Sequence, residues 1–490
     1  MVSRTVVIGA APAGLTAAYE LSKNGHCVTV LESAEKVGGF ARTESYRGHR
    51  FDLGNYGFSS HGFSWQIQVV QQLWHEILGD CFVQVPPRSR ICYRYRLFDY
   101  PLSITNALKH TGPIDSTLIA TSYLATQAKA QLYPEQQLET LEDWLKNRFG
   151  SHLHRIFFEP YVKKIWGLPS AAIHSDLAVS IAKKRSLFNL VADSLLAKNQ
   201  AAAPDIFDYP ALGAGMMWQK CRWLIEDTGS AVETNARVVK IAHTGKRIRQ
   251  ILIQRGQGEN AQLSEAAVDQ CISSLPIVDL IERLDPPAPI AVQKAAEQLK
   301  YRDLIVVSLV INAKSVFEDS SLYIQNPEFK VSRIQDFKNW SAAMAEDPHK
   351  TCLSLEYFCA AGDDLSKMGD DDLVRLAGKE LAGLGLVTDA SLLEGGVVVR
   401  QQQVYPVYDN AYYRYLGLVQ DYLEGFENLQ TAGAQGLYRQ PDMALETLTG
   451  MLAARNVLGE RHNLWEVTEH TELRRFAKDT ADVGQRLRNR

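Results

Sequence analysis

The sequence lacks the long apolar run that a membrane-spanning helix requires. Such a helix takes about 18 or more consecutive apolar residues, and no stretch of that length occurs. The apolar run at the N-terminus has no basic leader and is soon broken by a glycine-rich turn. We therefore interpret it as a first strand rather than a signal peptide, and expect no membrane insertion.

Cysteine is also scarce. Seven cysteines, an odd number, are scattered through the 490 residues, several of them within apolar runs. This pattern suits reduced core cysteines of a cytoplasmic protein better than disulfides or a metal site. It predicts a cytoplasmic location and no bound metal. The cysteines are Cys27, Cys81, Cys92, Cys221, Cys271, Cys352 and Cys359.

An excess of basic charge is missing as well. The formal net charge is only −4, so no overall positive field would attract nucleic acid. Short basic runs at Lys183–Arg185 and Arg486–Arg490 are typical of a solvated helix face and a chain end. What is present is 46% hydrophobic residues in a chain long enough for two or three cores. This composition fits a large soluble enzyme with a small-molecule substrate, and homo-oligomerisation stays open.

The most informative motif joins a strand at Thr5–Ile8 to the glycine-rich turn Gly9–Gly14. A helix is expected over Leu15–Leu21 and a second strand over Cys27–Leu31. Glu32 ends that strand, where a carboxylate can bind the ribose hydroxyls of an adenosine. Strand, turn, helix, strand and terminal acid in register predict a βαβ dinucleotide-binding unit. The residues predicted to hold the pyrophosphate are Gly9, Ala11, Pro12, Ala13 and Gly14.

One position departs from the dinucleotide fingerprint. Its middle glycine normally lets the backbone approach the pyrophosphate closely, but Ala11 stands there in this chain. We expect the Ala11 methyl group to crowd that approach. A Rossmann-like unit that holds no nucleotide therefore stays open as an alternative.

A second glycine pair follows the βαβ unit and separates flavin enzymes from simple NAD dehydrogenases. It lies in Val37–Thr43, ahead of Gly48–Gly54. With these motifs the chain resembles the FAD-dependent amine oxidase and protoporphyrinogen oxidase superfamily, and within it the branch similar to UDP-galactopyranose mutase. The resemblance implies FAD as the cofactor. It places Glu32 on the ribose, Gly38 and Gly39 at the second turn, and Arg42 near the phosphates.

The resemblance extends over nearly the whole chain. It implies an α/β fold with a discontinuous Rossmann-like FAD-binding domain and an inserted helical and mixed-sheet substrate domain. We predict the FAD-binding domain over residues 1–60, 216–285 and 421–490, a helix-rich insertion over 61–215, and a substrate-cavity sheet domain over 286–420. The later motifs that carry the resemblance are Phe98–Leu102, Phe158–Pro169, Gly213–Trp218, Arg333–Trp340 and Tyr405–Asp409.

Apolar spacing predicts further elements of these domains. By resemblance, Val239 touches the adenine through its backbone, and Gly433 lies on the isoalloxazine side of the flavin. The expected helices cover Glu139–Phe149, Leu153–Trp166 and Thr447–Leu458. The expected strands cover Thr234–Ile241, Arg247–Ile253, Leu304–Ile311 and part of Asp269–Pro276, and Lys198–Pro204 is expected to be a mobile loop.

Several positions that face the flavin in close relatives differ here. Those relatives carry a glycine and a histidine in place of Asn55 and Tyr56, an arginine in place of Ala434, and Asn-Asn-Gln-Asp-His-Ser in place of Pro441–Glu446. That last run starts a helix, whose N–H groups favour an electron-rich ligand, whereas its acids add negative charge or cap the helix. Weak, unusual or absent flavin binding therefore stays open. The predicted contacts at this end are Asn55, Tyr56 and Met443.

Candidate substrate-binding residues follow from the sugar-mutase branch, where two arginines and tyrosines hold a diphosphate. Arg333 matches one of these arginines. The other position holds Ser180, with Arg185 about one helical turn further on. Losing one bidentate clamp weakens the binding of a nucleotide sugar, so the mutase activity is half supported.

The remaining catalytic candidates also have plainer interpretations. Tyr405 and Asp409 match a cavity tyrosine and its neighbouring acid, and Trp166 matches a cavity-wall aromatic. Tyr405 could equally end a strand in the core, and Trp166 could serve packing. His61 would be a general base if it turned into the cavity, or else a solvated loop histidine.

Three classes of function remain. The first is an FAD-dependent oxidoreductase that takes hydride from a C–H bond next to nitrogen or oxygen in a small or medium-sized polar metabolite. The second is a non-redox isomerase, either similar to a nucleotide-sugar mutase or a cofactor-altered enzyme. The third is a binding protein that has lost the chemistry, against which a cavity lined by the candidates above would argue.

Overall fold

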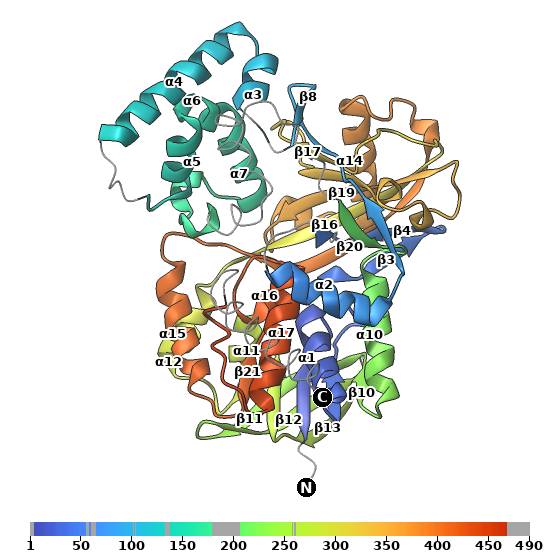
Figure 1. Cartoon of the computed structure of the whole chain (residues 1–490), viewed down its shortest axis with the longest axis vertical. Helices are drawn as coiled ribbons and strands as arrows, with labels where there is room; N and C mark the ends of the chain where they lie inside the picture. Colours follow the sequence, from blue (N-terminus) through green and yellow to red (C-terminus); the bar gives the residue numbers. More distant parts are fainter. Residues whose placement is uncertain are drawn as a thin grey trace, which may run out of the picture.

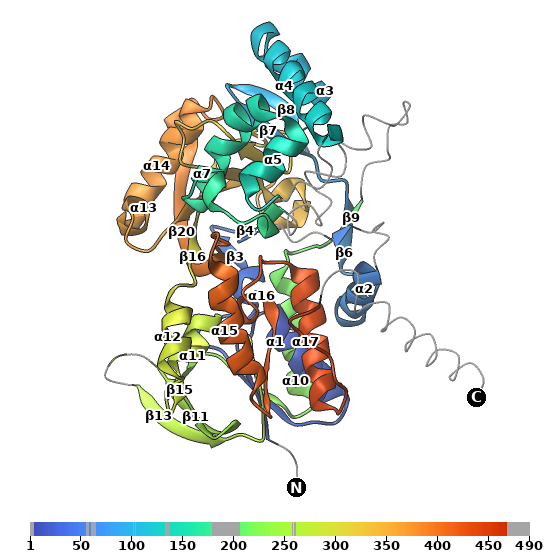
Figure 2. The same ribbon diagram turned by 90° about the vertical axis from the view of Figure 1, so that its left-hand side faces the viewer.

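The computed structural model describes residues 4–54, 58–59, 65–100, 102, 104–132, 138–178, 206–256, 258 and 261–467. Figures 1 and 2 show two bodies, one above the other, with the long strands β16 (Tyr301–Ile311) and β20 (Leu393–Pro406) at their junction. The lower body holds the dinucleotide motif. Among the helices of the described residues, none has the length and apolarity needed to cross a bilayer.

A five-stranded parallel sheet forms the centre of the lower body, with the strand order β10-β2-β1-β14-β21. All four residues of β1 are buried, as expected for a parallel strand covered on both faces. The chain leaves β1 for β2 on one side, and β14 flanks β1 on the other. Such a switch point is where open α/β sheets bind ligands, at the carboxyl ends of the strands. The strands are β1 (Thr5–Ile8), β2 (Val28–Leu31), β10 (Ala231–Glu233), β14 (Gln270–Ser273) and β21 (Leu429–Thr431).

Two layers cover this sheet. One core cluster joins it to four helices, namely α1 (Pro12–Lys23), α2 (Trp65–Leu78), α10 (Gly215–Asp227) and α17 (Met443–Val457). Another core cluster joins it to a four-stranded sheet in the order β13-β12-β11-β15 and to three helices. These elements are β11 (Ala236–Thr244), β12 (Arg247–Arg255), β13 (Gln262–Ala267), β15 (Leu284–Asp285), α11 (Ile277–Glu282), α12 (Ile290–Glu297) and α15 (Tyr412–Glu424).

The upper body is built on a seven-stranded sheet in the order β20-β16-β19-β18-β17-β7-β8. The strand predicted over Leu304–Ile311 lies within β16, which pairs antiparallel with both β19 and β20. The sheet also takes in a hairpin from before residue 100, because β7 pairs parallel with β17. The other members are β7 (Ser89–Tyr93), β8 (Arg96–Asp99), β17 (Ser321–Ile324), β18 (Arg333–Asp336) and β19 (Thr351–Cys359), with α13 (Asp364–Lys367) and α14 (Asp370–Gly383) beside them.

A helical insertion stands beside this sheet (Figure 1). It comprises α3 (Ile104–His110), α4 (Pro113–Leu132), α5 (Leu141–Phe149), α6 (Ser151–Leu153), a π-helical turn over His154–Phe158, and α7 (Glu159–Trp166). A capping box between Thr140 and Asp143 starts α5 two residues after the predicted position. The helix predicted over Leu153–Trp166 is instead divided by the π-helical turn. The predicted loop at Lys198–Pro204 lies outside the described residues.

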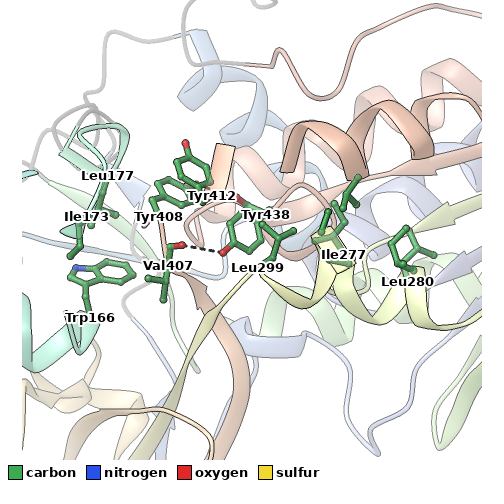
Figure 3. Close-up of a cluster of buried hydrophobic side chains, with 14 of the residues drawn as sticks. Trp166, Ile173, Leu177, Ile277, Leu280, Leu299, Val407, Tyr408, Tyr412 and Tyr438 are labelled. Atoms are coloured by element: carbon green, nitrogen blue, oxygen red, sulfur yellow. Dashed lines mark hydrogen bonds between the residues drawn. The ribbon is translucent and has the colours of Figure 1, made fainter. Parts of the chain in front are cut away.

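Two small sheets connect the bodies: the hairpin β3 (Thr43–Tyr46) and β4 (His49–Asp52), and a three-stranded sheet of β5 (Phe58–Ser59), β9 (Phe207–Pro210) and β6 (Phe82–Val85). One apolar cluster also runs from Trp166 on α7 through Val407 to Ile277 on α11 (Figure 3). Within it, the Tyr438 hydroxyl donates to the Val407 carbonyl at 3.1 Å. This shared core holds the two bodies together, while the predicted domain boundaries stay a prediction. All seven cysteines are free thiols, and five of them are buried.

Candidate functional site

The fingerprint turn has room only for glycine at two positions. Gly9 has φ +98°, and a Cβ there would lie 2.3 Å from Ser274 Oγ. A Cβ on Gly14 would lie 2.0 Å from the Gly9 carbonyl oxygen. Helix α1 then begins at Pro12 with no capping side chain and no acid in its first turn. The N–H groups of this turn are thus arranged for an anion such as a pyrophosphate.

The second glycine pair packs directly on this turn. Gly38 and Gly39 have φ +100° and +53°, and the Gly38 N–H donates to the Ala10 carbonyl at 2.8 Å. A Cβ on Gly39 would lie 2.9 Å from the Ala11 Cβ. The Ala11 methyl group therefore faces the second glycine pair, which the resemblance also assigns to the cofactor.

We expect Ala11→Gly to tighten FAD binding, by roughly threefold to tenfold, because it removes the methyl group that faces the second glycine pair. Glycine is also tolerated at this N-cap position at least as well as alanine. The measurement is a fluorescence titration of flavin-free protein with FAD. Ala361→Gly, in an exposed turn far along the chain, is the matched control. Unchanged affinity of the Ala11 variant would remove crowding as an explanation.

The residues predicted to bind the adenosine follow the carboxyl end of β2 and lie on β11. Glu32 accepts hydrogen bonds from the Ala10 and Ala34 N–H groups, each at 2.8 Å. A β-bulge in β11 sets Val239 out of register, between the pairs Val238–Ile253 and Lys240–Leu252. Bulges are frequent next to binding sites because they redirect the local backbone. The Ala236 N–H donates to the Glu32 carbonyl at 2.8 Å, so β11, the strand that carries Val239, begins beside Glu32.

Arg42 lies beside the second glycine pair, and its guanidinium already has partners within the protein. Its Nε donates to Glu44 at 2.6 Å, and its Nη1 donates to the Gly39 carbonyl at 2.9 Å and to Gln401 at 3.3 Å. Its guanidinium thus fixes the geometry of the glycine turn. Contact between Arg42 and a phosphate stays a prediction.

The C-terminal return of the chain closes against α1. Gly433 has φ +80°, and a Cβ there would lie 2.9 Å from the Ala13 Cβ. Helix α17 starts at the buried Met443, four residues earlier than predicted, because Asp442 caps it by accepting a hydrogen bond from the Leu445 N–H at 3.1 Å. The capping interpretation of this acid is confirmed, so the N-terminus of α17 already has its negative partner.

Asp52 has a structural role next to the predicted site, and the sequence analysis did not identify it. It is fully buried on β4 and accepts hydrogen bonds from the Thr43 hydroxyl, the Tyr209 hydroxyl at 2.7 Å and the Ala214 N–H at 3.1 Å. It therefore anchors the start of α10. Burial raises the pKa of Asp52 to about 6, although these hydrogen bonds favour the charged form.

This pKa predicts a pH-dependent stability. Folded Asp52 binds its proton more tightly than the unfolded chain, whose value is 3.8. Its contribution to stability is therefore complete at low pH and is lost as the pH rises through about 6. Relative to Asp52→Asn, we expect the free energy of unfolding of the wild type to fall by up to about 3 kcal/mol between pH 4 and 7. Urea unfolding of both proteins across this range measures it, and a constant difference would contradict it.

The substrate candidates centre on an ion pair between two strands. Arg333 on β18 lies opposite Glu356 on β19, and its Nε and Nη2 donate to the two carboxylate oxygens at 3.0 and 2.7 Å. Glu356 is 1% exposed and also accepts from the Gln335 amide at 2.6 Å. Burial alone would lower the pKa of Arg333, but the Glu356 carboxylate raises it well above its usual value. The Arg333 charge is thus permanent and paired.

Aromatic rings surround this ion pair. Tyr405 on β20 has ring centroids of Phe40, Trp166 and Phe358 at 6.2, 6.3 and 5.0 Å. Tyr323 lies 5.8 Å from the Arg333 guanidinium. Phe40 directly follows the second glycine pair, so the aromatic wall begins where the predicted flavin turn ends. Burial raises the pKa of Tyr405, which keeps its phenol protonated.

Helix α7 holds the strands that carry Arg333 and Tyr323. Lys164 is mostly buried, and its ammonium donates to the carbonyls of Ile324, Asn326 and Val331 at 2.7, 2.8 and 3.1 Å. Burial lowers the pKa of Lys164 to about 8. The position of the ion pair therefore depends on a cation from the helical insertion.

The other candidates lie elsewhere. The Asp409 carboxylate contacts the Lys300 ammonium at 3.1 Å and accepts from the Ala411 N–H at 3.0 Å, so it caps the turn before α15. Its contacts within the described residues do not include Arg333 or Tyr405, and its catalytic role stays a prediction. The candidates His61, Asn55, Tyr56, Ser180 and Arg185 lie outside the described residues.

A glycine-rich turn between strand and helix, followed by a second glycine pair whose neighbour Phe40 contacts the aromatic rings of the upper body, agrees with the predicted flavoprotein fold. The chain belongs to the family described as flavin containing amine oxidoreductase, whose model matches residues 12–458. The predicted superfamily and α/β fold are confirmed. FAD is the cofactor that this membership indicates.

The described residues fit FAD, because α1 starts with no capping side chain and no acid in its first turn, and its N–H groups are left for an anion. Gly9 and Gly14 keep this turn compact, since a Cβ at either position would clash with protein atoms. An L-amino-acid oxidase of Bothrops moojeni is 24% identical over 342 residues, which cover 65% of this chain and 61% of that protein. The chain therefore spans less than two thirds of this curated relative.

Two solved structures are similar in fold. A reduced UDP-galactopyranose mutase matches with a TM-score of 0.76 at 18% identity, covering 94% of this chain and 97% of that one. A putrescine oxidase bound to putrescine matches with a TM-score of 0.60 at 16% identity, covering 94% and 99%. At these identities the likeness concerns the fold alone.

Proposed function

We propose that the protein is an FAD-dependent oxidoreductase that removes hydride from a C–H bond next to nitrogen or oxygen in a small or medium-sized polar metabolite. The observation that carries this proposal is the contact of Tyr405 with Phe40, because it joins the second glycine pair to the aromatic rings that are predicted to line the substrate cavity, here called the aromatic cavity. A substrate in the cavity would lie beside the flavin end of the nucleotide site.

In this proposal the residues of the chain have separate binding roles. Gly9, Gly14 and the start of α1 hold the pyrophosphate, Glu32 the ribose, and Val239 the adenine. FAD, when bound, accepts the hydride. Tyr405, Trp166 and Phe40 exclude water from the reacting carbon and orient it, and the protonated Tyr405 hydroxyl supplies a hydrogen bond to a polar group of the substrate.

The ion pair weighs against the alternative, a nucleotide-sugar mutase. A diphosphate clamp needs a bidentate guanidinium, but two donors of Arg333 are already bound to a buried carboxylate. A diphosphate would have to displace Glu356 and would meet its negative charge. Arg333 and Glu356 together carry no net charge. They therefore suit a compact substrate whose polar end contacts this pair.

Anaerobic mixing of the FAD-loaded protein with panels of amines, amino acids and hydroxy acids tests the proposal. The expected result is loss of the blue absorption band of oxidised flavin with one panel, and its return on admission of oxygen or another acceptor. Turnover of UDP-galactopyranose that depends on dithionite, without bleaching by any panel, would overturn it in favour of the mutase.

A further inference from the structure

A separate cleft lies between the β3–β4 hairpin and the loop that precedes β19. Its volume is about 560 Å³, within the range of small-molecule sites. The hairpin lies beside the seven-stranded sheet (Figure 1), and Glu346 joins it by donating its N–H to the Gly48 carbonyl at 3.1 Å. The polar residues that line the cleft are Arg47, His49, Glu346, Asp347, Lys350 and Glu394.

Both cations of this cleft contact Glu394, although Arg47 contacts only its neutral carbonyl, so the three carboxylates of the cleft exceed its two cations by one charge. The Lys350 ammonium lies 2.7 Å from a Glu394 carboxylate oxygen, and Arg47 donates to the Glu394 carbonyl. Glu346 differs, because within the described part of the chain its carboxylate has no hydrogen bond or ion pair. That carboxylate lies over Gly48, where a Cβ would be 2.3 Å from Oε2. Asp347 accepts one hydrogen bond, from the His349 N–H at 2.9 Å.

His49 supplies the second, independent observation. It lines the cleft and is only 1% exposed, yet its Nδ1 has no hydrogen-bond partner among the described residues. A buried polar atom without a partner is costly. Burial lowers the pKa of His49, so the ring is neutral near pH 7 and one of its nitrogens is an acceptor.

We propose that this cleft binds a small organic cation with N–H donors, of the alkylammonium class. The groups left without partners are the Glu346 carboxylate, the second oxygen of Asp347 and His49 Nδ1, which accepts a hydrogen bond when the ring proton is on Nε2. An ammonium group offers up to three N–H donors and a positive charge to match them. Within the described ranges no three histidine, cysteine or acidic side chains are arranged to hold a metal ion. The site is distinct from the aromatic cavity and does not depend on the proposed function.

Calorimetric titration of the FAD-loaded full chain with tert-butylammonium chloride tests this site. This cation has no C–H bond next to its nitrogen, so the proposed reaction cannot consume it. We expect one saturable site, weakened at least about tenfold by Glu346→Gln through the lost charge-assisted hydrogen bond. Glu282→Gln, an exposed acid on α11, is the matched control and should leave binding unchanged.

Tetramethylammonium, which has no N–H donor, should bind at least about tenfold more weakly than tert-butylammonium. Absence of saturable heat, or equal binding of the two cations, would overturn the proposal. Saturable Ca²⁺ binding that Glu346→Gln abolishes would replace it with a metal site. Binding that Tyr405→Ala abolishes and Glu346→Gln leaves intact would place the cation in the aromatic cavity instead.

Discussion

Glu356→Gln is expected to destabilise the protein by about 3–5 kcal/mol, because it leaves the Arg333 guanidinium buried without its counter-charge. Arg333 loses a bidentate partner, and Gln335 loses the carboxylate to which it donates. The energy comes chiefly from the unpaired charge, since a buried pair contributes little net stability when it is intact. Urea unfolding of the FAD-loaded protein gives the change in free energy directly.

A double variant distinguishes the effect of the unpaired charge on stability from the effect of altered packing. In Arg333→Met/Glu356→Gln the guanidinium is gone, so most of the lost stability should return. Glu318→Gln is the matched surface control. Its carboxylate lies 3.8 Å from Arg88 with 87% of the side chain exposed, so little change is expected. A Glu356→Gln protein as stable as the Glu318→Gln control would show that Arg333 is not held by this pair.

The local motifs of the nucleotide site could be predicted because each lies within one short stretch. Strand β1, the glycine turn and the start of α1 occupy ten consecutive residues, and the glycines are required by the backbone itself. The second glycine pair is equally local. Its packing on Ala11 follows from the hydrogen bond between Gly38 and Ala10.

Glu356 could not be predicted in the same way. Its partnership with Arg333 depends on the register of β18 against β19, and register is set by the whole sheet. The available signal was a single acid within the apolar strand Thr351–Cys359, since a buried charge needs a partner. Asp52 was hidden for a similar reason, because its partners Tyr209 and Ala214 come from far along the chain.

The contacts of Asp409 could not be predicted from the sequence either. The resemblance assigned Tyr405 and Asp409 to one cavity, and in the structure strand β20 ends at Pro406, between them. Asp409 then caps the turn before α15 and pairs with Lys300. The contacts of a residue beyond the end of a strand therefore depend on how the chain turns there, which the sequence pattern of the strand does not specify.

Gly450→Ala is expected to remove bound FAD and to destabilise the protein by about 1–3 kcal/mol or more, as overpacking in a close-packed core does. Gly450 lies inside α17, and a Cβ there would be 2.2 Å from the Ala13 carbonyl oxygen and 3.0 Å from the Ala13 Cα. Both obstacles are backbone atoms of α1, so no rotamer change relieves them. The two helices must separate, which displaces the start of α1 from the position in which it is proposed to bind the pyrophosphate of FAD.

Gly417→Ala is the matched control, because it makes the same change in the middle of another helix. No atom lies within 4 Å of a Cβ at Gly417 on α15. Alanine there should stabilise the protein by up to about 1 kcal/mol, since glycine loses more backbone entropy in a helix. Absorbance of protein-bound flavin after desalting and urea unfolding measure both variants. If Gly450→Ala kept stoichiometric FAD and the stability of Gly417→Ala, the contact of α1 with α17 would not control the nucleotide site. If only the Gly450 variant lost both, the helix pair would set the geometry of the glycine turn.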